Sequence, residues 1–96
     1  MAAVENLTPG DILREEFLVP MGITQAMLAR ATGLAPACVS EVVNGKRAVT
    51  AEVDLRLGRY FGLSEGYWLR LQAAHDLMAA RRRIAGELRR IKPRAA

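Results

Sequence analysis

The 96-residue chain is long enough for one compact domain with a modest core and too short for two. Its hydrophobic fraction of 51% and charged fraction of 25% are ordinary for a soluble globular protein, and because it shows neither a membrane-spanning apolar run nor an export-signal pattern we expect it in the cytoplasm. The net charge of +4 is uneven, since residues 81–96 hold seven of the 14 basic and one of the 10 acidic side chains (+6), which leaves −2 on residues 1–80.

The first two expected helices are marked by residues that favour helix starts and stops. Thr8 suits an N-cap with Pro9 at the first helical position, and we expect Pro20 to end this helix. Thr24 caps a second helix, which Gly33 ends. The apolar residues expected to face inward are Ile12, Leu13, Phe17, Leu18, Met27, Leu28 and Ala31.

Three more helices are expected, and no stretch alternates with the period of a strand. A third helix begins at Pro36 and ends at an "NG" turn, Thr50 caps a fourth that Gly62 ends, and Ser64 begins a fifth. The fold class is therefore all-α, with a single five-helix domain over residues 1–80. The apolar surface of these helices comes from Val39, Val42, Val43, Val53, Leu55, Leu57, Tyr60, Phe61, Trp68, Leu69, Leu71, Leu77 and Met78.

The last expected helix is too long for a small domain. Apolar residues recur every seven positions, so a helix continuing to Pro93 would carry an apolar seam beyond the domain, although Gly86 weakens this helix. We expect residues 81–96 to form a basic helical extension, with the seam packed on a partner chain; a frayed tail is the alternative. The seam residues are Leu77, Ile84, Leu88 and Ile91.

Residues 24–44 have the pattern of a helix-turn-helix. Two short helices flank a turn centred on Gly33, which takes the left-handed conformation without a Cβ penalty, and the small Ala29 lies where the helices must cross. In such a motif the second helix presents its N-terminal residues to the major groove of DNA. An ordinary helical hairpin in a small bundle is the alternative.

Three stretches, "PGDILREEFL", "MGITQAMLARATGL" and "VVNGKRAVTAEVDLRLGRYFGLSEGYWLRLQAAHDL", resemble the HigA antitoxin family, also called virulence-associated protein I. This family lies within the XRE-type, phage-repressor-like helix-turn-helix proteins. The resemblance implies a lambda-repressor-like fold of five helices and repression of the protein's own operon. It also implies a HigB-type, ribosome-dependent mRNA-cleaving toxin as the partner.

The third helix is expected to offer few specific contacts to bases. Ala37 reaches only a thymine methyl group, Ser40 bonds several bases with little discrimination, and Glu41 accepts from a cytosine amine but repels phosphate. Family members often carry longer polar or basic residues here, so we expect binding dominated by the DNA backbone, with specificity from DNA shape. The groove-facing candidates are Pro36, Ala37, Ser40, Glu41 and Asn44.

The expected phosphate contacts lie around that helix. Gln25, at the N-terminus of the second helix, matches a position that commonly contacts phosphate in XRE proteins, and Lys46 and Arg47 follow the third helix directly. Thr50 adds a possible donor, although helix capping alone would explain it. Solvent exposure is the alternative for Gln25 and the basic pair.

Nothing in the sequence predicts an enzyme, a cofactor or a metal site. His75 and Cys38 are the single histidine and cysteine, which leaves no zinc spacing, no nucleophile–base pattern and no internal disulfide. Glu15 and Glu16 are adjacent and point in different directions on a helix. We expect Cys38 and Trp68 to be packing residues.

The leading hypothesis is a homodimeric antitoxin that binds double-stranded operator DNA, represses its own operon and neutralises a HigB-type toxin. A dimer is expected because one short reading helix supplies little affinity. Two alternatives remain: a solitary XRE-type regulator without a toxin, and a protein-interaction module that has lost DNA binding. The basic tail lies along DNA, pairs with an acidic partner, or only solubilises a helix end.

Overall fold

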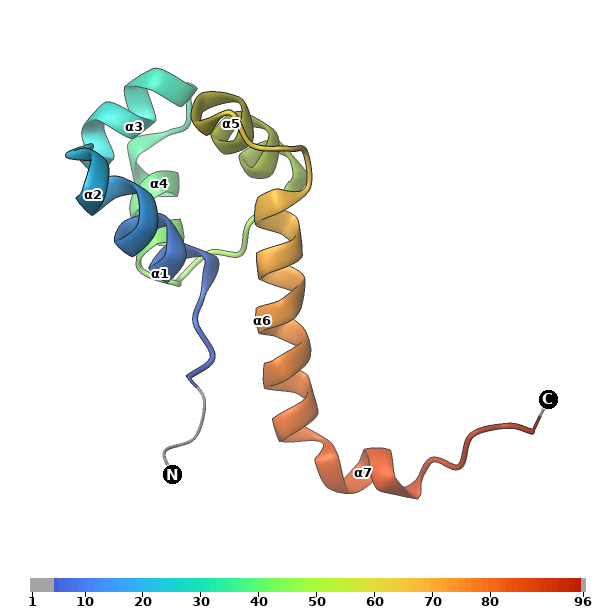
Figure 1. Cartoon of the computed structure of the whole chain (residues 1–96). Helices are drawn as coiled ribbons and strands as arrows, with labels where there is room; N and C mark the ends of the chain where they lie inside the picture. Colours follow the sequence, from blue (N-terminus) through green and yellow to red (C-terminus); the bar gives the residue numbers. More distant parts are fainter. Residues whose placement is uncertain (1–4, 96) are drawn as a thin grey trace.

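The computed structural model describes residues 5–95, and these form helices and turns without any strand (Figure 1). The first helical stretch is continuous but changes type along its length. The elements are α1 (Pro9–Ile12), η1 (Leu13–Leu18), α2 (Val19–Met21), α3 (Gln25–Thr32), α4 (Pro36–Val43), α5 (Ala51–Phe61), α6 (Tyr67–Arg83) and α7 (Ala85–Arg90). The all-α prediction is confirmed, with six helices in this range instead of five because the last one is broken.

The first helix passes through Pro20, and the prediction that it ends there is wrong. Its middle segment, η1, is π-helical, and the Val19 N–H donates to the carbonyl of Arg14, five residues earlier. The wider turn moves the preceding carbonyls away from the proline ring, which would clash with them in a regular α-helix. The helix ends at Met21, and its C-cap Gly22, two residues after Pro20, has a left-handed φ of 65°.

The core lies among the first five helices and the first turn of α6. Trp68 is fully buried, as expected, and the rings of Phe17 and Phe61 lie against each other at 4.8 Å with Phe17 also 5.2 Å from Trp68. Cys38 packs against this core as a half-buried residue. The buried hydrophobic residues are Leu13, Leu18, Leu28, Ala29, Leu34, Val39, Val42, Val43, Val49, Val53, Leu57 and Trp68.

Several residues that we expected inside lie on the surface. Helix α3 buries Leu28, Ala29 and Thr32, so Met27 and Ala31 belong to its outer side. The inward face of α5 likewise holds a polar residue, because Val53, Asp54, Leu57 and Gly58 are its buried residues. A rotation of one residue on a helix moves a side chain by 100°, enough to exchange these faces. Among the residues expected to supply the apolar surface of α5 and α6, Leu55, Tyr60 and Leu69 are exposed; Leu77 is exposed as well, but it was expected in the outward-facing seam.

Helix α6 is joined to α5 by a buried carboxylate. Asp54 is 1% exposed and accepts from the backbone N–H groups of Gly66 and Trp68, both at 2.7 Å, and of Leu69 at 3.1 Å. These N–H groups at the start of α6 have no partner within their own helix. The predicted start at Ser64 is therefore wrong: Ser64 lies in the preceding turn, and the cap comes from another helix.

The N-terminus of α1 touches α4 closely at Gly10. A Cβ atom on Gly10 would lie 2.0 Å from the carbonyl oxygen of Val42 and 2.7 Å from that of Val43. Only glycine allows this approach of backbone to backbone. The capping box of Thr8 and Asp11 holds the same turn, with the Asp11 N–H donating to Thr8 Oγ1 at 3.1 Å.

The C-terminal part of α6 and helix α7 project from the rest of the molecule as a stalk, which we define as residues 77–91 so that it includes the C-cap of α7, Ile91 (Figure 1). The helix breaks at Ile84, whose φ and ψ are −113° and 21°, so the predicted continuous helix to Pro93 is wrong. Gly86 lowers helix stability just after the break, and the three arginines 81–83 end α6 where cations favour free carbonyls. We call residues 8–76 the head.

Candidate nucleic-acid interface

Helices α3 and α4 form the predicted helix-turn-helix. Gly33, with φ of 75°, ends α3 and its N–H donates to the carbonyl of Ala29 at 2.9 Å. Leu34 is buried in the turn, and α4 starts two residues later at Pro36. The Arg56 guanidinium of α5 donates to the carbonyl of Thr32 at 2.8 Å, which fixes the end of α3 against the head.

Helix α4 buries one side and leaves the other open. Its inward residues Val39, Val42 and Val43 are at most 3% exposed. On the opposite side the groove-facing candidates are accessible, with Ser40 and Glu41 partly exposed and the Asn44 amide 3.4 Å from Ser40 Oγ. The fully exposed candidates are Pro36, Ala37 and Asn44. This outward side is free of the protein's own body and has room for another molecule.

A tight turn brings two cations to the end of α4. The Lys46 N–H donates to the Glu41 carbonyl at 2.8 Å and the Gly45 N–H to that of Val42 at 3.1 Å, with Gly45 left-handed at φ of 72°. Lys46 and Arg47 are both exposed. The turn therefore stays against α4, and the next residues return to the head.

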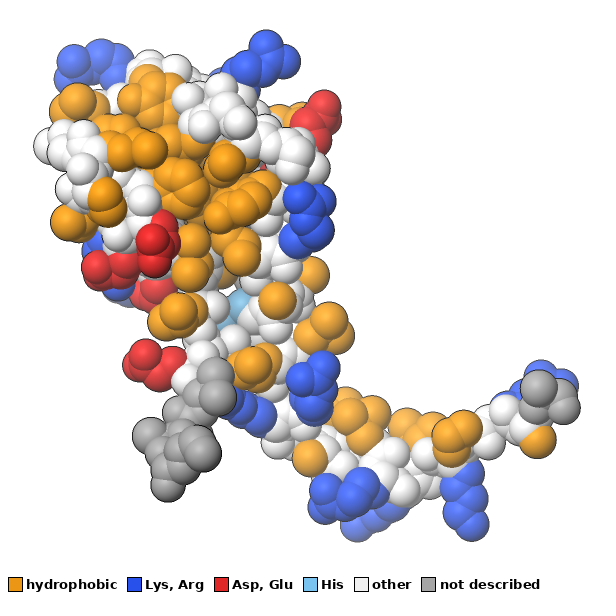
Figure 2. All heavy atoms as spheres, viewed as in Figure 1, with side chains coloured by type: hydrophobic (Ala, Val, Ile, Leu, Met, Phe, Trp, Pro, Cys, Tyr) orange, Lys and Arg blue, Asp and Glu red, His pale blue; other side chains and the backbone are white. Residues whose placement is uncertain are grey.

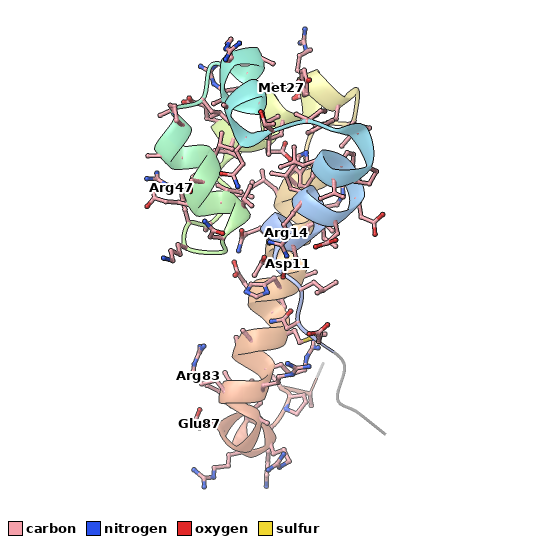
Figure 3. All side chains as sticks on the ribbon, turned by 90° about the vertical axis from the view of Figure 1, so that its left-hand side faces the viewer. Asp11, Arg14, Met27, Arg47, Arg83 and Glu87 are labelled. Carbon is pink, nitrogen blue, oxygen red and sulfur yellow. The ribbon has the colours of Figure 1, made fainter. Side chains whose placement is uncertain are left out.

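Arg47 reaches back over α4 and pairs with Glu41. Its Nη2 and Nε atoms lie 2.7 and 3.2 Å from the same carboxylate oxygen, Oε1 (Figure 3). The hydrogen bonds that Arg47 donates to the Glu41 carboxylate raise the pKa of Arg47 above its ordinary value, so the guanidinium stays charged in any usual buffer. The sequence analysis missed this pair; the signal was an acid and a base on either side of a two-residue turn.

The two remaining phosphate candidates lie at helix starts. Gln25 is exposed in the first turn of α3, where the Thr24 side chain caps the N–H of Met27 at 3.1 Å. Thr50 accepts from the Val53 N–H at 3.4 Å and is exposed, so its hydroxyl serves as the cap of α5. Gln25 thus offers an uncommitted side-chain amide, whereas Thr50 already has a structural role.

A pocket of about 230 Å³ lies below the turn that follows α4, between the start of α1 and the middle of α6. Lys46, His75 and Asp76 line it, and the carbonyl of His75 accepts from the Asn6 amide at 2.9 Å. On its far side the Val49 N–H donates to Gln72 Oε1 at 2.8 Å. The pocket therefore lies between the turn that holds Lys46 and Arg47 and helix α6, while the hydrogen bond from Val49 to Gln72 links the following segment to α6.

Residues 5–95 hold neither a metal-binding cluster nor a membrane-spanning helix. Within that range no group of three or more His, Cys, Asp or Glu side chains is arranged to hold a metal ion. None of the helices described there has the length and hydropathy needed to cross a membrane.

Comparison with known sequences identifies relatives along most of the chain. A helix-turn-helix family model matches residues 13–68. Virulence-associated protein I of Dichelobacter nodosus is 47% identical over 72 residues, which cover 75% of this chain and 67% of that protein. Antitoxin HigA-1 of Vibrio cholerae is 40% identical over 84 residues, which cover 88% of this chain and 79% of the antitoxin.

Solved structures give the same result for the fold. The Pseudomonas aeruginosa antitoxin HigA with the higBA promoter superimposes with a TM-score of 0.88 at 35% identity, covering 95% of this chain and 100% of that one. Antitoxin GraA in complex with its operator gives 0.86 at 34% identity, covering 100% of this chain and 97% of that one. With its helix-turn-helix matched over more than half of its length and HigA-1 matched over most of both proteins, this chain belongs to the HigA antitoxin family of XRE-type helix-turn-helix proteins.

Proposed function

We propose that this protein is a DNA-binding antitoxin that binds its operator as a homodimer, represses its own operon and neutralises a HigB-type mRNA-cleaving toxin. The observation that carries the proposal is the open outward side of α4 opposite a buried inward side. Relatives of the same fold have been solved with a promoter and with an operator. Because the DNA of a bacterial operon is cytoplasmic, this function places the protein in the cytoplasm.

In this proposal the outward side of α4 enters the major groove and the flanking groups bind phosphates. Lys46 is the main phosphate cation, since its ammonium has no ion-pair partner among residues 5–95. Gln25 and the free N–H groups at the start of α3 serve the neighbouring phosphate. Thr50 adds a weaker contact because its hydroxyl already caps α5.

The test is a titration of a promoter duplex against the protein over a range of salt concentrations. Each lost phosphate contact lowers the slope of log K against log [salt] by about 1, so we expect Lys46→Ala to flatten the slope by that amount. Arg59→Ala on α5 removes one exposed cation away from α4 and should leave the slope unchanged. If the protein did not bind the duplex at low salt, the regulator hypothesis would be excluded and the protein-interaction module would remain.

The homodimer is proposed to form through the stalk. Leu77, Leu88 and Ile91 are 61%, 43% and 69% exposed, and Ile84 is half-buried at the break, so these apolar side chains lie open to a partner. Figure 2 shows hydrophobic and basic side chains gathered along this projecting part of the molecule. We assign residues 1–80 to DNA binding and the basic extension 81–96 to association, where the seam packs and the cations remain at its edge.

The toxin partner separates an antitoxin from a solitary regulator. A HigB-type toxin would be encoded beside this gene, and co-expression should give a complex that co-purifies and suppresses mRNA cleavage in a translation assay. A protein that binds its promoter but captures no product of the adjacent gene would be a solitary XRE-type regulator.

A further inference from the structure

The ion pair between Glu41 and Arg47 leaves half of the guanidinium unused. Arg47 directs Nε and Nη2 to Glu41 Oε1, which occupies one edge of its planar group. The other edge, formed by Nη1 and the second N–H of Nη2, has no acceptor among the described residues. An arginine held in this way has a fixed orientation and a free two-donor fork.

The free fork lies on the side of α4 that is open. Glu41 is on α4 itself, one turn after Ala37, and the guanidinium folds back toward it from the turn that follows the helix (Figure 3). Ala37 and Ser40 are too short to reach far into a groove. Arg47 therefore brings a long side chain to a surface whose own residues are small.

We propose that Glu41 is a positioning residue that holds Arg47 for recognition of a guanine in the major groove. The inference rests on the proposed DNA binding and names the chemistry that gives this site its specificity. Guanine presents two neutral acceptors, O6 and N7, at the spacing of an arginine fork. A phosphate is a poorer partner for this pair, because the Glu41 carboxylate would repel it and cancels the arginine charge.

The neighbouring cation has the opposite role. Lys46 carries one point charge that has no ion-pair partner in the described part of the chain, which suits a phosphate on any sequence. Arg47 is paired, oriented and directed over α4, which suits a base edge. Glu41, whose charge would by itself repel DNA, thus helps base recognition because it holds the Arg47 side chain in place. An exposed ion pair with only a stability role would contribute little to folding and would not alter sequence preference.

The experiment begins with selection of binding sites from a duplex pool with a randomised core, using the wild-type protein. Affinities are then measured for the selected duplex, for a scrambled duplex, and for selected duplexes in which single guanines are replaced by 7-deazaguanine, which lacks the N7 acceptor. The variants are Glu41→Gln, Arg47→Ala and Lys46→Ala. Glu52→Gln is the matched control, because it breaks another exposed pair, with Arg56, on α5. Circular dichroism establishes that each variant is folded.

We expect wild type to lose about tenfold in affinity at one 7-deazaguanine position, and Arg47→Ala to lose about tenfold on the unmodified site with no further loss at that position. Glu41→Gln should reduce the ratio of selected to scrambled affinity by about three- to tenfold. Lys46→Ala should weaken both duplexes alike, and Glu52→Gln should match wild type.

Two results would overturn the inference while leaving DNA binding intact. In the first, Glu41→Gln binds selected and scrambled duplexes more tightly by the same factor, which makes Glu41 a simple repulsive charge. In the second, Arg47→Ala loses as much affinity as wild type does at every position where guanine is replaced by 7-deazaguanine. A wild-type protein that binds neither the randomised pool nor any single duplex at low salt would instead refute the proposed DNA binding, and the inference with it.

Discussion

The head buries many of its large apolar side chains, whereas the stalk exposes most of its own. In the head every buried hydrophobic residue lies between Leu13 and Trp68, which are also the limits of the helix-turn-helix family model. After Trp68 none of the residues described up to position 95 is buried, and the large apolar side chains of the stalk face outward. The head therefore contains its own core, whereas the stalk exposes apolar surface that the proposed dimer would cover.

This difference has a thermodynamic consequence. Burial of a large apolar side chain contributes about 1.5–3 kcal/mol, and the head gains this within one chain. In the proposed dimer the stalk would gain it only on association, so the order of the stalk would depend on protein concentration and the stability of the head would not. The predictions below separate the two parts, beginning with the residue that joins them.

The largest effect is expected for Asp54→Ala, which removes the carboxylate that links α5 to the start of α6. Three backbone N–H groups would lose their acceptor in a buried site, at a cost of about 3–5 kcal/mol in the free energy of unfolding. Urea denaturation followed by circular dichroism measures it. Asp54→Asn keeps one acceptor oxygen and should lose less. Equal loss in both variants would show that the charge, not the acceptor, stabilises the junction.

The next effect concerns the stalk alone. Leu77→Asp with Ile84→Asp should weaken self-association at least a hundredfold, because charges replace apolar surface at the expected interface, and should leave the unfolding of the diluted monomer nearly unchanged. Sedimentation equilibrium gives the mass. Glu87→Gln, an exposed polar change on the same stalk, is the control. An unchanged mass in the double variant would remove the stalk from the interface.

Two glycines provide a smaller contrast between the regions. Gly10→Ala should destabilise the head by about 2–3 kcal/mol, since its Cβ would overlap the Val42 carbonyl of α4. Gly86→Ala meets only the end of the Arg89 side chain at 4.0 Å and should stabilise helix α7 by about 0.5–1 kcal/mol. Thermal unfolding measures the first change, and helix content by circular dichroism the second. If Gly10→Ala melts as wild type does, α1 and α4 do not approach as described.

The smallest effect is a pH dependence of the head. Hydrogen bonds from the Thr8 backbone and side chain and from Arg14 hold the pKa of Asp11 below its usual 3.8. The folded state thus binds this proton more weakly than the unfolded state, so the stabilisation is present above about pH 4 and is lost as the pH falls through the folded pKa. Its size is below about 1 kcal/mol at this solvated position. Asp11→Asn should flatten this acid dependence in urea titrations; an unaltered curve would exclude Asp11 as its source.

Local signals in the sequence predicted much of the head. Thr24 and Thr50 cap their helices, and Gly33 and Gly62 end theirs in the left-handed conformation, because capping and chirality act over a few residues. The accessible side of α4 followed from the position of its three valines. The assignment of candidate residues to bases and phosphates stays a prediction.

The errors arose where distant segments determine the outcome. The cap of α6 comes from Asp54, twelve to fifteen residues away, although an acid between Val53 and Leu57 on a helix face was a signal that it needed buried partners. The passage through Pro20 depends on a π-helical shift that no propensity encodes. The break at Ile84 interrupts a heptad pattern that is regular in the sequence. The pattern therefore predicted an exposed row of apolar side chains, but it did not predict that the helix carrying them is broken.

The hydrogen bond from Val49 to Gln72 has a consequence for regulation. It ties the segment after α4, which holds Lys46 and Arg47, to the helix that runs into the stalk. A ligand that tilted α6 would act on this hydrogen bond, and through it on the segment that holds the two cations. The resulting coupling is reciprocal: whatever factor such a ligand applies to operator affinity, the operator applies to the ligand's own affinity. Under the proposed function, the Gln72 side chain would couple operator binding to the binding of the toxin partner.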